Sequence, residues 1–339
     1  MRLFLSDLRI IALGITLGLL LACAIPSDKI EAEASGAQEG VENNRMFSFT
    51  YSVQVYPTMD ALNIFLPIAQ SNSQQSILKM DIESRIEGEI RQEQLYGNKF
   101  WYAQLEDGLV DTLNISISYT VKRPHNSRAY RANLNTDVLT ENEMRLFLSA
   151  NARVPVDGSL VDSIRAKLDP APEKSLAKAR SIYDYVVGNM VYKKVGTGWG
   201  NGDTYWACSE QYGNCTDFHA LFTSLARAEG IPARFEIGFP VPMDKEAGSI
   251  DGYHCWVNFY LEETGWFPVD ASEAQKDLSK KELLFGTQPP DRIQFTTGRD
   301  LELGEGHESG PLNYFVYPHL EQNGKIYSGY SRSFAYKNI

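Results

Sequence analysis

The chain of 339 residues is poor in cysteine and histidine, with four of the former and five of the latter. It has no cluster of lysine and arginine, and its formal net charge is −11. Because proteins bind nucleic acid by pairing Lys and Arg with phosphates, this charge argues against a nucleic-acid partner. The hydrophobic fraction of 43% suits a globular protein with room for two domains.

Near the N-terminus, the apolar run over residues 10–22 is too short to span a bilayer comfortably and has the length of a signal-peptide core. It ends in Leu-Leu-Ala-Cys at residues 20–23, which resembles the cleavage motif of bacterial lipoproteins. This resemblance implies removal of residues 1–22, lipidation of Cys23 and a lipid anchor on the periplasmic side of the cell envelope, and Ala24 favours the outer membrane. The alternative is a plain signal peptide or signal anchor, with Cys23 incidental.

Composition and periodicity divide the rest of the chain. Residues 23–45 are polar and acidic, which indicates a disordered tether. Residues 46–137 contain segments in which apolar and polar residues alternate, as in 47–55 and 109–121, which predicts a β-sandwich with a recognition or spacer role. Residues 138–300 mix helical and strand patterns and form the predicted catalytic domain, and residues 301–339 are predicted to be C-terminal strands packed on it.

Cys215 stands at the start of a strong helical run over residues 217–229. A thiol at a helix N-terminus meets unpaired N–H groups and the positive end of the helix dipole, which favour the nucleophilic thiolate. His254 opens one predicted strand and Asp270 ends another, so adjacent antiparallel strands can hold the two side chains together. The pattern predicts a nucleophile, a base and a carboxylate that orients the base.

Several motifs around these residues together resemble the transglutaminase-like superfamily, a branch of the papain-like cysteine enzymes. The resemblance covers roughly residues 145–300. The matching segments are residues 213–219 (Gly-Asn-Cys-Thr-Asp-Phe-His), 230–234 (Gly-Ile-Pro-Ala-Arg), 252–256 (Gly-Tyr-His-Cys-Trp), 265–270 (Gly-Trp-Phe-Pro-Val-Asp) and 268–274 (Pro-Val-Asp-Ala-Ser-Glu-Ala). The resemblance implies an α+β fold in which a helix bearing the cysteine packs on an antiparallel sheet bearing His and Asp.

The same resemblance implies Cys215 as nucleophile, His254 as general base and acid, and Asp270 as the residue that orients His254. It implies no metal and no organic cofactor. Relatives often take an oxyanion donor from a Trp or Gln upstream of the nucleophile, and the candidates here are Trp206, Gln211 and, further away, Trp199. Trp199 and Trp206 are also candidates for lining a substrate groove.

The remaining chemistry-bearing residues leave alternatives open. In an oxidising compartment Cys208 and Cys255 can pair and leave Cys215 free, whereas a disulfide between Cys208 and Cys215, or three free thiols, are the alternatives. His219, one helical turn after Cys215, is predicted to be structural, because the superfamily base comes from the strand. A zinc site built from Cys215, His219, His254 and Asp270 is a rival, but the spacing matches no compact zinc motif.

One further residue near the nucleophile is assigned a structural role. Asp217 is predicted to cap the helix or to pair with Arg234.

The sequence thus predicts a cysteine enzyme that acts on amide bonds through an acyl-enzyme, with hydrolysis by a peptidase or amidase favoured. Its expected partner is a protein or peptide substrate in the cell envelope. The first alternative is acyl transfer from protein glutamine to a second amine, which cross-links proteins. The second is a non-catalytic binding or scaffold module that uses the β-sandwich as its contact surface.

Overall fold

The structure is a computed structural model, and it describes residues 44–124, 127–128, 138–168 and 174–339. The predicted signal peptide, Cys23 and nearly all of the predicted tether lie outside these residues. None of the helices in the described ranges is long and apolar enough to cross a membrane. Contacts between Cα atoms group all the described residues into one compact unit.

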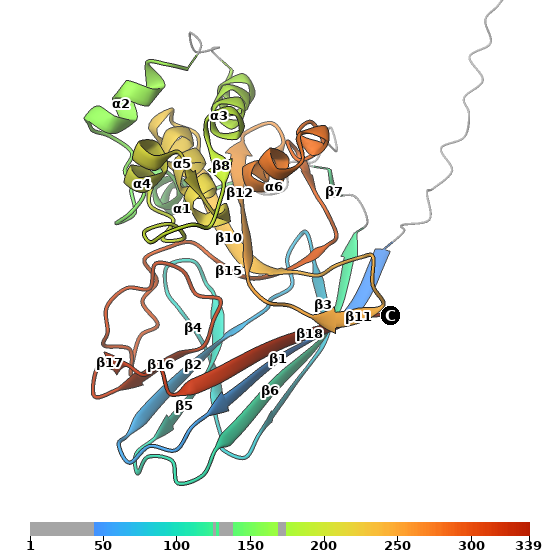
Figure 1. Ribbon diagram of the computed structural model, residues 1–339, viewed down its shortest axis with the longest axis vertical. Coiled ribbons are helices and arrows are strands. Elements are labelled where there is room, and N and C mark those ends of the chain that lie inside the picture. The colour runs from blue at the N-terminus through green and yellow to red at the C-terminus, as the bar shows by residue number, and fades with distance from the viewer. Residues whose placement is uncertain (1–43, 125–126, 129–137, 169–173) are drawn as a thin grey trace, which may run out of the picture. The chain divides into compact units, whose positions relative to one another are not determined.

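Two five-stranded antiparallel sheets form the β-sandwich, which lies at the end of this unit opposite the helices (Figure 1). In spatial order, the first sheet contains β11 (Ala247–Ser249), β18 (Tyr330–Asn338), β1 (Asn44–Val55), β6 (Leu113–Pro124) and β3 (Ser76–Ser84). The second contains β17 (Lys325–Ile326), β16 (His319–Gln322), β2 (Leu62–Ile68), β5 (Lys99–Leu105) and β4 (Glu89–Gln92).

The alternating sequence pattern explains the core of the sandwich. Along β1 and β6 every second side chain is buried, so each strand gives one apolar face to the interior. The buried apolar residues of the two strands are Phe47, Phe49, Tyr51, Val53, Val55, Leu113, Ile115, Ile117, Tyr119 and Val121, and Arg123 of β6 is buried in line with them. The predicted N-terminal β-sandwich is therefore confirmed, although its first strand starts two residues inside the predicted tether.

The C-terminal strands lie elsewhere than predicted. β18 pairs with β1 along its whole length, and β16 pairs with β2, so both strands complete the two sheets of the sandwich. The prediction that residues 301–339 pack on the catalytic domain is therefore wrong for these strands. Pairing between strands distant in sequence leaves no local signal, because any alternating strand can pair with any other.

A four-stranded antiparallel sheet and its helices make up the second part, with the helices gathered together in Figure 1. The strands, in spatial order, are β13 (Gly265–Val269), β12 (His254–Leu261), β10 (Ala233–Pro240) and β15 (Arg292–Thr297). The helices are α1 (Glu141–Leu148), α2 (Ser159–Arg165), α3 (Ser175–Asn189), α4 (Thr204–Glu210), α5 (Cys215–Ala228) and α6 (Ala271–Lys276), with a 3-10 helix η1 (Leu278–Lys280). Two short pairs join distant segments: parallel β8 (Val191–Tyr192) with β9 (Tyr212–Gly213), and antiparallel β7 (Ser127–Arg128) with β14 (Thr287–Gln288).

Helix α5 is the centre of this part. Its residues from Cys215 to Arg227 are buried, because it packs against β12 and β10 and is surrounded by α3, α4 and α6. Phe218, Phe222 and Leu225 supply its apolar contacts. This arrangement of a central helix on an antiparallel sheet is the predicted α+β fold, and it carries Cys215 to the sheet that bears His254.

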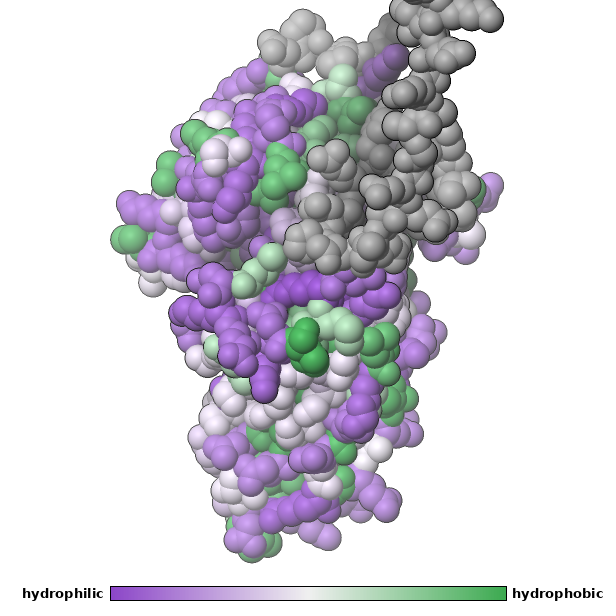
Figure 2. Space-filling view, turned by 90° about the vertical axis from the view of Figure 1, so that its right-hand side faces the viewer, coloured by the Kyte–Doolittle hydropathy of each residue, from purple (hydrophilic) through white to green (hydrophobic). Residues whose placement is uncertain are grey.

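On the face drawn in Figure 2, hydrophilic residues prevail and hydrophobic residues gather only in small groups. The two most exposed large apolar side chains, Met59 and Val110, lie in loops that the bridge between Thr58 and Leu109 holds together.

Candidate active site

The N-terminus of α5 is held by a reciprocal cap around Cys215. The Asn214 Oδ1 atom accepts a hydrogen bond of 2.9 Å from the Thr216 N–H, and the Asp217 carboxylate accepts one of 3.0 Å from the Asn214 N–H. Asp217 also accepts from the N–H groups of Gly200 and Gly202, so it fixes the glycine-rich loop beside the nucleophile. Of its two predicted roles, Asp217 therefore has the capping one.

His254 and Asp270 meet at the ends of neighbouring strands. His254 is the first residue of β12, and Asp270 follows the last residue of β13, to which β12 is paired. The His254 Nε2 atom lies 2.7 Å from Asp270 Oδ2. Asp270 also caps α6, where its Oδ1 accepts from the Glu273 N–H at 3.1 Å. One carboxylate therefore orients the imidazole and is itself fixed by a helix start.

Arg292 is a member of the site that the sequence analysis missed. Its Nη1 donates to Asp270 Oδ2 at 2.9 Å, and its Nε donates to Asp291 Oδ1 at 3.0 Å. The Arg292 residue is only 2% exposed. It reaches Asp270 from β15, and no local motif marks it, because the contact exists only through the sheet order.

The electrostatics of the three predicted catalytic residues favour charged forms. Burial works to raise the pKa of Asp270, but the positive charges of His254 and Arg292 outweigh it and hold that pKa well below its usual range. For His254, burial works to lower the pKa, but the Asp270 carboxylate outweighs it and raises the pKa to about 10.

Cys215 completes this charged arrangement. Burial works to raise the pKa of the thiol, but hydrogen bonds to Cys255 and His254 outweigh it and keep the pKa well below the ordinary value. Because His254 Nε2 is bound to Asp270, its Nδ1 is the nitrogen left to face the sulfur. The site can therefore hold a thiolate next to an imidazolium.

The three cysteines of the described chain are free thiols, so the predicted pairing of Cys208 with Cys255 is wrong. Cys208 lies on α4 and packs against the helical core. Cys255 lies on β12, belongs to the other core cluster and contacts Cys215. The alternative pairing of Cys208 with Cys215 is not formed either.

His219 is buried in the helix and does not act as a second base in this geometry. Its Nε2 accepts the Ala271 N–H at 3.2 Å, and its Nδ1 lies 3.4 Å from Cys255 Sγ. Burial lowers the pKa of His219 to about 4, so the ring is neutral at ordinary pH. These contacts fit the predicted structural role.

Two of the three oxyanion candidates have their side-chain donors bound elsewhere. The Trp206 indole N–H donates to the Tyr212 carbonyl at 3.0 Å, and the Trp199 indole N–H donates to the Gly196 carbonyl at 3.1 Å. Gln211 is exposed at the C-cap of α4, in the left-handed conformation. An oxyanion role for Trp206 or Trp199 is therefore not supported, because both indole donors already stabilise backbone turns, whereas Gln211 stays a prediction.

A cavity of about 480 Å³ opens beside the base. Its lining includes Tyr192, Tyr253, His254, Glu273, Lys276 and Arg292. Trp199 and Trp206 do not belong to this lining. Cys215 is 2% exposed and does not line the cavity either. In this structure the cavity therefore reaches the imidazole and not the sulfur.

Two tyrosines near the thiol were also missed by the sequence analysis. The Asn214 side-chain amide donates to the Tyr253 hydroxyl at 3.0 Å, and that hydroxyl lies 3.5 Å from the hydroxyl of Tyr314. Tyr253 directly precedes His254 in the sequence, which is the only local signal for it.

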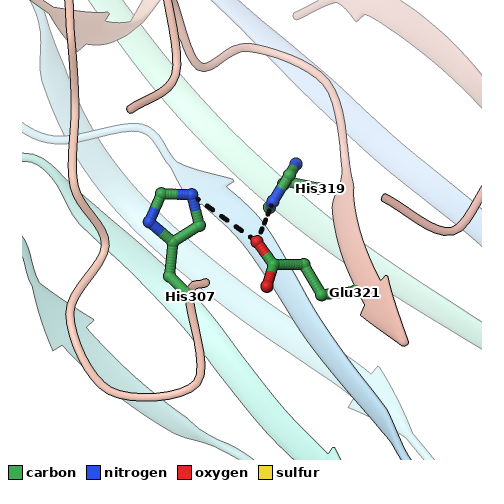
Figure 3. A group of neighbouring side chains, drawn as sticks. All are labelled: His307, His319 and Glu321. Atoms are coloured by element: carbon green, nitrogen blue, oxygen red, sulfur yellow. Dashed lines mark hydrogen bonds and ion pairs between the residues drawn. The ribbon is translucent and has the colours of Figure 1, made fainter. Parts of the chain in front are cut away.

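The candidate zinc ligands around Cys215 do not form a metal-ligand group. Among the described residues, the one group of ligand side chains that converges is His307, His319 and Glu321, in the sandwich (Figure 3). His307 Nδ1 accepts the Leu303 N–H at 3.1 Å, so the ring proton belongs on Nε2, the nitrogen 3.6 Å from Glu321. A metal at that nitrogen would need the proton to move to Nδ1, against the Leu303 N–H.

Hydrogen bonds explain this group without a metal. Glu321 accepts from His319 Nε2 at 2.7 Å and from the backbone N–H groups of Glu308 and Ser309 at 2.8 and 3.2 Å. Burial works against ionisation of this carboxyl, but these donors outweigh it and lower its pKa to about 2. We interpret the group as a buried carboxylate that ties a loop to β16.

Comparison with known proteins agrees with this geometry. Residues 161–271 match the model of the transglutaminase-like superfamily. An uncharacterized protein of Haemophilus influenzae is 29% identical over 220 residues, which is 56% of this chain and 59% of that protein. The uncharacterized protein YebA of Bacillus subtilis is 25% identical over 173 residues, or 46% of this chain and 23% of that one. The matches thus span about three fifths and about a quarter of these relatives.

Among solved structures, one from Cytophaga hutchinsonii, described as a candidate cysteine protease, covers 88% of this chain and 91% of its own. Its TM-score is 0.58 and its sequence identity is 17%, so the similarity is one of fold. The family match contains Cys215, His254 and Asp270 within its bounds. Residues 161–271 of the chain are thus similar to the transglutaminase-like superfamily.

Proposed function

We propose that the chain is a cysteine enzyme that acts on amide bonds of proteins or peptides through an acyl-enzyme, with hydrolysis as its main outcome. One observation carries the proposal. The Cys215 thiol, at the N-terminus of α5, is hydrogen-bonded to His254, and the other nitrogen of His254 lies 2.7 Å from Asp270. A thiolate, an imidazolium and a buried carboxylate in this order are the parts of a cysteine acyl-transfer site.

In the first half of the proposed reaction, the Cys215 thiolate attacks the carbonyl carbon of the amide and forms a carbon–sulfur bond. The His254 imidazolium gives its proton to the leaving amine as the carbon–nitrogen bond breaks. In the second half, His254 takes a proton from water, and the hydroxide attacks the thioester. The carbon–sulfur bond then breaks, which releases the acid and restores the thiolate.

The oxyanion that forms during each attack needs a donor close to the sulfur. The N–H groups of Thr216 and Asp217 are taken by the side chain and carbonyl of Asn214. The N–H of Cys215 itself opens helix α5 and lies next to the thiol. We assign the oxyanion to this N–H in the proposed mechanism.

The decisive test is the pH dependence with which Cys215 is alkylated in the purified full chain, in detergent, with labelled peptides identified by mass spectrometry. We expect labelling well below neutral pH. In His254→Ala we expect the labelling midpoint to move upward, because the imidazolium that lowers the thiol pKa is gone. Above about pH 10 the parental imidazolium loses its proton, so the ion pair exists only below that value.

Cys208 is an internal reference in the same experiment, because burial raises the pKa of its thiol to about 12. It should label only in strong alkali. If Cys215 titrates near the ordinary value of about 8.5 in both proteins, the chain is a binding module rather than an enzyme.

We also propose that the protein works at the cell envelope, held by a lipid on Cys23. The support is the Leu-Leu-Ala-Cys sequence at residues 20–23, directly after an apolar segment. Cys23→Ser is expected to move the protein from the membrane fraction to the soluble fraction, measured by immunoblot after ultracentrifugation. Cys208→Ser is the matched control and should stay with the membrane. Retention of Cys23→Ser in the membrane would show that another segment anchors the chain.

A further inference from the structure

Cys255 is a second buried thiol beside the nucleophile, and the mechanism above does not use it. It lies on β12 directly after His254 and is fully buried. Both side chains hydrogen-bond the Cys215 thiol. Cys255 and Cys215 also belong to the same core cluster. The two sulfurs are therefore neighbours in a region from which water is excluded.

The hydrogen bonds of His219 fix the position of its proton. Its Nε2 accepts the N–H of Ala271 at 3.2 Å, and a ring nitrogen that accepts a hydrogen bond cannot carry a proton. The ring proton is therefore on Nδ1, which lies 3.4 Å from Cys255 Sγ. Asp270 Oδ1 is 3.7 Å from His219 Nε2, too far for a hydrogen bond that would favour the other tautomer.

This tautomer sets the direction of the hydrogen bonds that lead to Cys215. Because His219 Nδ1–H donates to the sulfur of Cys255, the S–H of Cys255 is free to donate to Cys215. This series of hydrogen bonds starts at the first N–H of α6 and passes through His219 and Cys255. Every donor in it is turned toward the nucleophilic sulfur.

We propose that Cys255, oriented by His219, is a positioning residue that stabilises the Cys215 thiolate by donating its S–H to it. This inference rests on the proposed function, since it assigns a role within the same site. A hydrogen bond to an anionic acceptor is stronger than one between neutral groups, and the burial of both sulfurs strengthens it further.

The proton distribution within the pair supports this direction. Burial and the neighbouring thiolate raise the pKa of Cys255 well above the ordinary value, whereas the pKa of Cys215 is held well below it. The pair therefore keeps one proton, and that proton is on Cys255. Other charged or titratable groups near His219 are Asp270, His254 and Arg292, and they act on all variants alike.

The test compares Cys255→Ala with Cys255→Ser in full-length Cys208→Ser protein, where Cys215 is the thiol to be titrated. The measurements are the pH profile of iodoacetamide labelling and the ultraviolet absorbance of the thiolate. In Cys255→Ala, we expect the Cys215 midpoint to rise by about one pH unit, which is about tenfold less labelling on the acid side. Cys255→Ser keeps a donor of similar size and should restore the parental profile.

The possible results of this experiment separate the role proposed for Cys255 from the proposed function of the protein. An unchanged midpoint in Cys255→Ala overturns the proposal, and so does an equal shift in the alanine and serine variants, which would indicate altered packing rather than a lost donor. Neither outcome touches the proposed function, because the titration needs no substrate. If the parental Cys215 midpoint is itself near about 8.5, the proposed function fails instead.

A second measurement covers the case in which Cys255→Ala does not fold, as judged by circular dichroism. In the Cys208→Ser/Cys215→Ala protein, Cys255 is the remaining thiol of the three, and burial should keep it protonated through neutral pH. Thiolate absorbance that appears near neutral pH would overturn the proposal, because Cys255 would then be no proton donor.

Discussion

Cys215→Ala is expected to lower kcat/KM for cleavage of peptide bonds by ~10⁴- to 10⁶-fold, because removal of the nucleophile abolishes the acyl-enzyme route. The cleavage that remains should be what substrate binding and backbone hydrogen-bond donors can accelerate without the nucleophile. Cleavage is measured as new amino groups released from a mixture of peptides. A parallel assay for incorporation of a labelled primary amine reports transfer instead of hydrolysis. Both signals should disappear together in this variant, since both pass through the same thioester.

Cys208→Ala is the matched control for that experiment. Its thiol lies on α4 within the helical core and makes no contact with the three site residues in the hydrogen bonds described above. Activity should persist in this variant. If Cys215→Ala retained parental cleavage, the triad would not be the site of reaction.

Arg292→Met is expected to destabilise the fold by about 3 to 5 kcal/mol, because it leaves the buried Asp270 carboxylate without one of its two cationic partners. The measurement is urea unfolding at neutral pH. Arg153→Met is the control, since Arg153 pairs with Asp203 at 3.4 Å in an exposed setting and should cost less than about 1 kcal/mol. Equal losses in the two variants would contradict the structural assignment of Arg292.

The pH dependence of stability gives this prediction a second readout. The pKa of Asp270 is depressed on folding, so its stabilising effect is present above the unfolded pKa and is lost as pH falls through the folded pKa. The pKa of His254 is raised to about 10, so its effect is present below its unfolded value and is lost as pH rises through about 10. Without Arg292, Asp270 takes up its proton at a higher pH, so acid unfolding should begin at a higher pH than in the parental protein.

Local patterns predicted much of the fold. Alternation in residues 47–55 and 109–121 gave β1 and β6, because one face of each strand packs in the core of the sandwich. The polar start and apolar face of the run over residues 217–229 predicted α5, which in the structure spans Cys215–Ala228. Such patterns succeed because burial of one face imposes a period of two or 3.6 residues on the sequence.

The same reasoning failed for contacts between residues that are distant in the sequence. The predicted pairing of Cys208 with Cys255 failed because Cys208 packs against the helical core, whereas Cys255 belongs to the other core cluster. Trp206 was one of three oxyanion candidates, but its indole N–H is bound to the Tyr212 carbonyl. A residue type and its spacing do not reveal which donor is already occupied.

The sequence by itself determined the chemistry that is available: a cysteine at a helix start, a histidine that opens a strand and an aspartate that ends the next one. Only the tertiary structure decided which neighbouring residues hold those groups in their charged forms. Arg292 reaches Asp270 from another strand, and Cys255 and His219 meet beside Cys215 only after α5 packs on the sheet. The physical reason is that a pKa depends on burial and on neighbours in space, and neither is written in the order of residues.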